Sequence, residues 1–304
     1  MPGLPAGLRV LERGWLSSNN ILIQGRDQCA LIDSGYYTHA AQTLALVQDT
    51  LGARPLDLLL NTHLHSDHCG GNAALQAAYG ALQTHIPPGH AEAVRQWDLD
   101  TLGYAQAGQA CPRFAVNACL PVGGEIQLGD SRWQVHAAPG HDPHSVILFE
   151  PASRTLVSAD ALWERGFGVV FLELEGQPGF DAVAATLDHI ESLRPALVIP
   201  GHGTIFTDVA QALAQARQRL DSFVSDPARH DRHAAKVLLK FKLLSWQQVE
   251  RDTLLQWVQA TPHMHRLLAK CAPALDPGQA MDALLQDLQK AGVLRLQGSL
   301  VLND

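Results

Sequence analysis

A cluster of metal-binding residue types follows directly after the apolar run at residues 58–60. The sequence there reads Asn-Thr-His-Leu-His-Ser-Asp-His-Cys-Gly-Gly, which places His63, His65, Asp67 and His68 close together. Neutral imidazole and carboxylate are ligands that zinc and related divalent ions prefer. His63 and His65 are two residues apart, so in extended backbone both side chains point to one side. We therefore expect two pairs of ligands for two adjacent ions, rather than a polar loop whose histidines bond local backbone groups.

Three segments further along the chain end in a histidine or an aspartate. His141 lies in a loop between two predicted strands, Asp160 ends the apolar run 155–159, and His202 follows the apolar run 196–200. Each signal is weak alone, because polar residues at strand ends are common. Their occurrence together, in this order, predicts that they supply the remaining ligands of one site.

These motifs resemble the signature of the metallo-β-lactamase fold superfamily, which is His-x-His-x-Asp-His followed by a lone His, a lone Asp and a lone His at strand ends. The resemblance extends from about residue 8 to residue 203. The last two motifs are more similar to those of glyoxalase II and thioesterases than to those of the lactam-cleaving enzymes. The resemblance implies a first metal ion held by His63, His65 and His141, and a second held by Asp67, His68 and His202, with Asp160 bridging both.

Further residues are expected to support these ligands. The resemblance implies that Asp33 lies beneath the segment of residues 61–71, the metal loop. His144 is predicted to orient a ligand imidazole rather than to bind metal, since such outer hydrogen bonds fix the imidazole tautomer. Cys69 is a candidate soft ligand, but because the predicted ligand set is complete without it, it is expected to be a small filler in a tight turn. Gly70 and Gly71 are expected to let the chain turn sharply after His68.

Two neighbouring ions predict hydrolytic chemistry, because they can share a hydroxide at neutral pH that attacks a carbonyl. Asp67 can then serve both as a ligand and as the proton acceptor from water. We predict a dinuclear metal-dependent hydrolase that cleaves a thioester or similar activated acyl bond of a small-molecule substrate. Zinc is the expected metal, with iron or manganese as alternatives. A lactone or phosphoester hydrolase is the nearest alternative, and a nucleic-acid processing protein is an alternative of another class.

Composition narrows these alternatives. The formal net charge of −8 argues against general nucleic-acid binding, which depends on clustered lysine and arginine. No apolar run approaches the length of a membrane span, and the first seven residues lack the pattern of a secretory signal. We therefore expect a cytoplasmic protein without membrane contact. Five scattered cysteines fit a reducing compartment: Cys29, Cys69, Cys111, Cys119 and Cys271.

The pattern of elements predicts an α+β fold, an αββα sandwich of two mixed sheets flanked by helices. This catalytic domain is expected over residues 1–206. One of its helices is predicted over residues 38–51, with Thr38 as its cap, and a helical insertion, including a helix over 91–102, interrupts the domain at about residues 89–120. The insertion either overhangs the site or packs as an ordinary amphipathic helix.

Residues 207–304 are predicted to form a helical domain that ends in a hairpin and resembles a winged helix. Acidic residues on its would-be recognition helix, residues 279–290, disfavour DNA binding. A domain that packs on the catalytic domain, narrows its pocket or forms a dimer is therefore preferred. The helices are expected over residues 208–223, 233–244, 246–259 and 278–291, with the hairpin at 293–302.

The substrate pocket is predicted from the loop that begins at Asp160, since a loop that starts at a metal ligand must pass the mouth of the site. Trp163 and Phe167 are its pocket candidates, and Tyr104 is a further one from the insertion. Arg165 is expected either to hold an anionic substrate group or to form an ordinary exposed ion pair.

Overall fold

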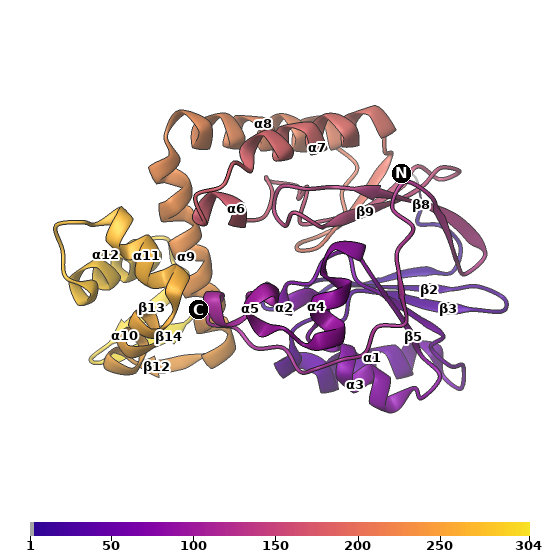
Figure 1. Cartoon of the computed structure of the whole chain (residues 1–304), viewed down its shortest axis with the longest axis horizontal. Helices are drawn as coiled ribbons and strands as arrows, with labels where there is room; N and C mark the ends of the chain where they lie inside the picture. The colour runs from indigo at the N-terminus through magenta and orange to yellow at the C-terminus, as the bar shows by residue number, and fades with distance from the viewer. Residues whose placement is uncertain (1–2) are drawn as a thin grey trace. The chain divides into compact units, whose positions relative to one another are not determined.

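The computed structural model describes residues 3–304 (Figure 1). The chain divides into two compact units. The first comprises the residues up to Leu102 together with Ala110–Leu220, and the second comprises Gly103–Gln109 and Asp221–Asp304. The change of unit falls within helix α8 (Val209–Ser225), later than the predicted boundary at residue 206. Compactness does not by itself define a folding domain, so the domains 1–206 and 207–304 stay a prediction.

The first unit contains two sheets. The six-stranded sheet has the order β1 (Leu8–Leu11), β2 (Asn20–Gln24), β3 (Cys29–Ile32), β4 (Leu58–Leu60), β5 (Gln83–Ile86) and β6 (Ala118–Cys119). The five-stranded sheet has the order β11 (Leu197–Pro200), β10 (Thr155–Ala159), β9 (Val146–Glu150), β8 (Ser131–Ala137) and β7 (Glu125–Leu128). Both sheets combine parallel and antiparallel pairs, for example β3 with β4 and β2 with β3. The prediction of two mixed sheets is confirmed.

Alternation along the strands separates two hydrophobic cores. Ile21 and Ile23 of β2 join a cluster that also contains Trp133 and Leu148 of the second sheet. Leu22, between them, instead joins a cluster with residues of α1 and α3. Successive side chains of a strand point to opposite faces, so one strand contributes to both cores. The buried layer between the sheets is therefore distinct from the layer beneath the helices.

Helices lie on the outer faces of the two sheets in the first unit, as the sandwich prediction requires. Figure 1 shows α1 (Ala40–Leu51) and α3 (Asn72–Ala78) beside the first sheet and α7 (Phe180–Leu193) beside the second. Most of the long helix α8 also belongs to this unit. The remaining helical segments are short: η1 (Tyr37–His39), α2 (Ser66–Cys69), η2 (Pro88–His90), α4 (Ala91–Gln96), α5 (Leu99–Leu102) and α6 (Phe171–Leu174).

Three local predictions were wrong. Thr38 lies within η1 and does not cap α1, whose N-cap is His39 without a side-chain hydrogen bond. The helix predicted over residues 91–102 is broken after Gln96, because Trp97 takes a left-handed conformation with φ of 59°.

Gly70 has an ordinary helical conformation, with φ of −63°. A Cβ on Gly70 would lie 2.5 Å from both the Ser66 carbonyl oxygen and the Tyr37 nitrogen, so its role is close backbone packing.

The second unit contains four further helices and a small sheet. The helices are α9 (Pro227–Trp246), α10 (Arg251–Ala260), α11 (Pro262–Cys271) and α12 (Pro277–Lys290), and the short η3 (Ala105–Ala107) also belongs here. The sheet has the order β12 (Gln248–Glu250), β14 (Leu300–Asn303) and β13 (Leu294–Gln297). The predicted terminal hairpin is present, but residues 248–250 form a strand on β14 where a helix was predicted. The winged-helix assignment stays a prediction.

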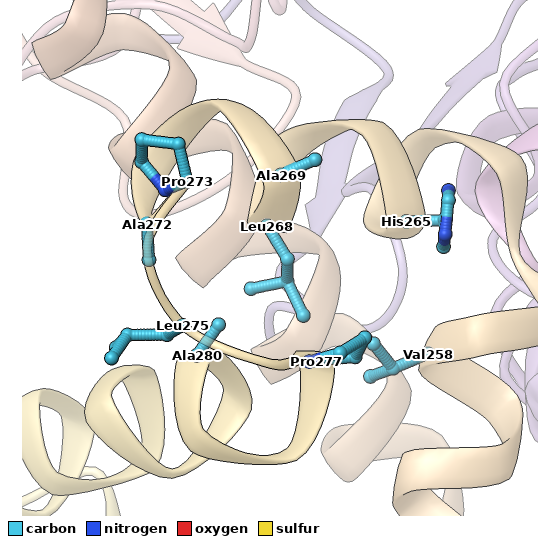
Figure 2. A pocket seen from close by; sticks show the side chains of 9 residues that line it. All are labelled: Val258, His265, Leu268, Ala269, Ala272, Pro273, Leu275, Pro277 and Ala280. Carbon is cyan, nitrogen blue, oxygen red and sulfur yellow. The ribbon is translucent and has the colours of Figure 1, made fainter.

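A small apolar cavity of about 170 Å³ lies within the second unit. Figure 2 shows that its lining comes from α10, α11, α12 and the connection between the last two. Leu268 and Val258 face it, and the imidazole of His265 stands at one side. Across residues 3–304, no helix combines the length and the apolar character needed to cross a membrane.

We predict that the second unit loses stability as pH falls from about 6.5 toward 4. Burial lowers the pKa of His230 and of His263 to about 4. An imidazole in the unfolded chain has a pKa of about 6.5, so the unfolded state binds more protons in this window. The stabilising contribution is complete above pH 6.5 and is lost as pH falls through the folded pKa.

Thermal unfolding across this pH range checks this expectation. Each of these histidines lowers the free energy of unfolding by at most about 1.4 kcal/mol for each pH unit of acidification, and its replacement removes that contribution. His230→Gln is therefore expected to give a shallower fall of Tm with falling pH than the unsubstituted chain. Parallel curves for the two proteins would contradict the assignment.

Candidate metal centre

Strand direction brings the predicted ligands to one place. β8 and β10 both run antiparallel to β9, and β11 runs parallel to β10. All three strands therefore end at the same edge of their sheet, where they are followed by His141, Asp160 and His202. His63 and His65 follow β4 of the other sheet.

The first ligand cluster consists of His63, His65 and His141, whose candidate ligand atoms all lie within 4.8 Å of one another. His65 Nδ1 lies 2.7 Å from His141 Nε2. His63 Nε2 is buried and has no hydrogen-bond partner among the described residues. A buried nitrogen without a partner is rare and costly unless a ligand occupies its lone pair.

The second cluster consists of Asp67, His68, Asp160 and His202, again within 4.8 Å. His202 Nε2 lies 3.1 Å from Asp67 Oδ2 and 3.8 Å from Asp160 Oδ2. Asp160 also approaches the first cluster, with its Oδ2 at 3.4 Å from His141 Nε2. Its carboxylate therefore stands between the two clusters, where a bridging ligand is expected.

Hydrogen bonds on the far side of the rings fix how the imidazoles face the site. Asp33 Oδ2 accepts from His68 Nδ1 at 2.7 Å, which leaves His68 Nε2 toward Asp160. His141 Nδ1 donates to the Val169 carbonyl oxygen at 2.6 Å. Such partners set the tautomer and orientation of a metal-binding histidine. Asp33 therefore contacts a predicted ligand of the metal loop, and its role in supporting a bound metal stays a prediction.

Electrostatics make this set of side chains a good group of metal donors. Burial, reinforced by the neighbouring His68, holds the pKa of His63 well below its ordinary value, and burial lowers the pKa of His65 to about 4. Burial alone would raise the pKa of Asp160, but His202 and His68 outweigh it and hold that pKa well below its ordinary value. At neutral pH the site therefore offers neutral His63 and His65 imidazoles and an ionised Asp160.

The imidazole of His68 differs from those of His63 and His65, because its pKa is raised rather than lowered. Burial acts to lower the pKa of His68, but Asp33 and Asp160 outweigh it and raise the pKa well above its ordinary value. Metal binding at His68 Nε2 thus requires the loss of a proton, as is common when a metal site forms.

Two glycines make room for ligand side chains. A Cβ at Gly201 would lie 2.2 Å from Asp160 Oδ1, and a Cβ at Gly168 would lie 2.3 Å from His141 Nδ1. Real Cβ atoms do not approach so closely, so any larger residue would displace a ligand. The sequence motif around His202 contains Gly201, but nothing in the sequence marked Gly168.

The donor set fits two divalent metal ions. Three nitrogens converge in one cluster, and two nitrogens with two carboxylates converge in the other. Nitrogen and oxygen donors of this kind suit zinc, iron and manganese. The buried Nε2 atom of His63, which lacks a hydrogen-bond partner in the described part of the chain, is the observation that favours a bound ion most directly.

Several residues around the site were not anticipated. Asp142 Oδ2 lies 3.9 Å from His65 Nε2. Phe171 packs against His65, with ring centroids 4.7 Å apart, and Trp15 stacks on His202. Asp142 stands in the His141 loop and could have been suspected from that motif. Trp15 and Phe171 carry no sequence signal, because only the folded chain brings them to the ligands.

The predicted supporting and pocket residues lie in different surroundings, and their roles stay predictions. His144 is exposed and its ring lies beside His90, with centroids 4.5 Å apart, rather than on a ligand; Asp142 stands beside a ligand instead. Phe167 is 2% exposed and packs in the interior, so it does not face an open pocket. Trp163 Nε1 donates to Asp160 Oδ1 at 3.1 Å, which places it at the site.

The two other pocket candidates stay predictions. Arg165 is exposed in the loop after Asp160. Tyr104 belongs to the second unit.

Cys69 is buried at the end of α2, directly after His68, and its Sγ lies 3.7 Å from Cys111 Sγ.

Comparisons with known proteins agree with this geometry. The sequence profile of the Metallo-beta-lactamase superfamily matches residues 13–202. A hydroxyacylglutathione hydrolase from Mesorhizobium japonicum is 29% identical over 190 residues, which cover 62% of this chain and 60% of that protein. The chain thus spans about three fifths of the length of that relative.

Solved structures share the fold. A beta-lactamase domain protein from Burkholderia ambifaria is 22% identical, with a TM-score of 0.61 over 99% of this chain and 94% of that one. The protein TTHA1623, solved in a di-iron-bound form, is 28% identical with a TM-score of 0.52 over 68% of this chain and 98% of that one.

We predict that Asp33→Asn weakens metal binding by about 10- to 100-fold, because the amide accepts less strongly from His68 Nδ1. Metal content after dialysis against a weak chelator measures the effect. Asp188→Asn serves as the matched control, since Asp188 pairs with Arg217 at the surface at 2.8 Å. Equal metal retention in both variants would contradict the role given to Asp33.

Proposed function

Because the chain belongs to the metallo-beta-lactamase superfamily, we propose that it is a metal-dependent hydrolase that cleaves a thioester or a similar activated acyl bond of a small molecule. The observation that carries the proposal is the convergence of two donor clusters on the carboxylate of Asp160. Such a site needs no serine or cysteine nucleophile, since water is the attacking group.

The chemistry divides between the ions and the chain. Two divalent ions, when bound, act as Lewis acids and lower the pKa of water toward neutrality. His63, His65 and His141 would hold one ion, and Asp67, His68 and His202 the other, with Asp160 between them. We propose zinc for both positions, with iron or manganese as alternatives; the relative TTHA1623 is described with iron.

Asp67 is the residue we assign to proton transfer. Its side chain is 13% exposed, so water reaches it. Burial alone would raise its pKa, but the hydrogen bond with His202 outweighs burial and lowers it. Asp67 is therefore ionised at neutral pH and able to accept a proton from water. Asp160 is held in place by the indole N–H of Trp163.

The bond class rests on the relatives' names. A hydroxyacylglutathione hydrolase cleaves an acyl group from the thiol of glutathione, which is a thioester bond. A lactone or phosphoester is the alternative substrate class, since the same donors would polarise either. We further propose that the protein acts in the cytoplasm, since its scattered cysteines suit a reducing compartment, and that it can form a homodimer.

A substrate panel tests the proposal. Zinc- and manganese-loaded protein is expected to hydrolyse thioesters faster than lactones or phosphoesters. His65→Ala and Asp160→Ala are expected to abolish turnover and to reduce metal content, because each removes a donor from a cluster. Full activity in either variant would refute the ligand assignment.

A gel shift at low ionic strength tests the nucleic-acid alternative. The net charge of −8 leads us to expect no binding of RNA or DNA. Salt-sensitive retardation of either would instead favour a nucleic-acid processing role.

A further inference from the structure

Trp15 is an exposed aromatic residue on the rim of the metal centre. It lies in the loop between β1 and β2, and 55% of its side chain is exposed. Its ring stacks on His202, with centroids 5.3 Å apart and planes at 7°. Trp15 is thus a large apolar side chain that is open to solvent and contacts a predicted metal-binding residue. Such apolar walls are typical of small-molecule binding sites.

Trp163 extends the same surface. The Trp15 and Trp163 rings meet edge to face, with centroids 5.3 Å apart, and Trp163 meets His202 at 5.7 Å. The indole N–H of Trp163 is already directed at Asp160. Trp163 therefore offers a substrate the carbon surface of its ring, beside the second cluster.

Hydrogen bonds hold the Trp15 loop on both loops that carry ligands of the second cluster. Ser18 N donates to the Asp67 carbonyl oxygen at 2.9 Å. Asn19 N donates to the Gly201 carbonyl oxygen at 2.7 Å, and the Asn19 amide donates to the Pro200 carbonyl oxygen at 3.0 Å. The aromatic surface is thus fixed relative to the ligands before any substrate arrives, which reduces the entropy lost on binding.

We propose that Trp15 and Trp163 form an aromatic subsite that takes an uncharged, apolar acyl group of the substrate. This inference rests on the proposed thioester hydrolysis and narrows its substrate class. The two indoles carry no charge, so the rings themselves offer an anionic group no ion pair. An aryl or alkyl chain would instead bury apolar area against both rings, and an aryl group would add ring–ring contact.

The alternative is that Trp15 only positions His202. A positioning residue would affect all substrates equally, whereas a subsite residue affects those with an apolar acyl group. Two thioesters of N-acetylcysteamine separate these roles, because the 3-phenylpropanoyl and acetyl compounds share one leaving group. The metal-loaded protein is expected to prefer the phenylpropanoyl compound in kcat/KM, and Trp15→Ala is expected to reduce that preference roughly three- to tenfold. Trp15→Phe, which keeps a ring, is expected to retain most of it. Equal losses on both compounds in Trp15→Ala would overturn the subsite.

Calorimetric titration with the free acids gives a readout that does not need turnover. 3-Phenylpropanoate is expected to bind more tightly than acetate, with roughly three- to tenfold weaker binding in Trp15→Ala and little change in Trp15→Phe. Absent binding of phenylpropanoate, or binding unaffected by Trp15→Ala, would overturn the subsite. Absent hydrolysis of every thioester with Trp15-dependent binding intact would overturn the proposed function and support the subsite.

Discussion

The carboxylate of Asp33 makes the hydrogen bonds on which the geometry of the candidate metal centre depends. It accepts from the backbone N–H of Thr62 at 2.9 Å and from the Thr62 hydroxyl at 2.8 Å, as well as from His68. Asp33 itself has a left-handed backbone, with φ of 59°, which aspartate tolerates better than most residues. One buried side chain at the end of β3 therefore fixes both the start of the metal loop and the orientation of one of its ligands.

The sheets explain why ligands so distant in sequence meet. β8, β10 and β11 terminate on the same side of the second sheet, and β4 of the first sheet leads directly into the segment that carries His63. Both cores between and beneath the sheets are built from alternating side chains, so a shift of one strand by a single residue would exchange the buried faces. The strand register therefore helps to set where the donor loops begin.

The sequence predicted those parts of the protein that follow from short-range patterns. The motif from His63 to His68 and the apolar runs before Asp160 and His202 indicated the clusters that the structure brings together. The sequence could not show that His144 turns to His90 or that Phe167 is buried, because both depend on packing between segments. The break at Trp97 was missed for a similar reason, since the periodic pattern of that helix continues through it.

The loop between β1 and β2 contributes no metal donor, yet it spans the distance between two donor loops. Ser18 N donates to the backbone of Asp67, and Asn19 N donates to that of Gly201, so two adjacent residues of a third segment link the two donor loops. Residues outside the histidine motifs therefore constrain the separation of the Asp67 and His202 loops, and with it the spacing of the donor atoms in the second cluster.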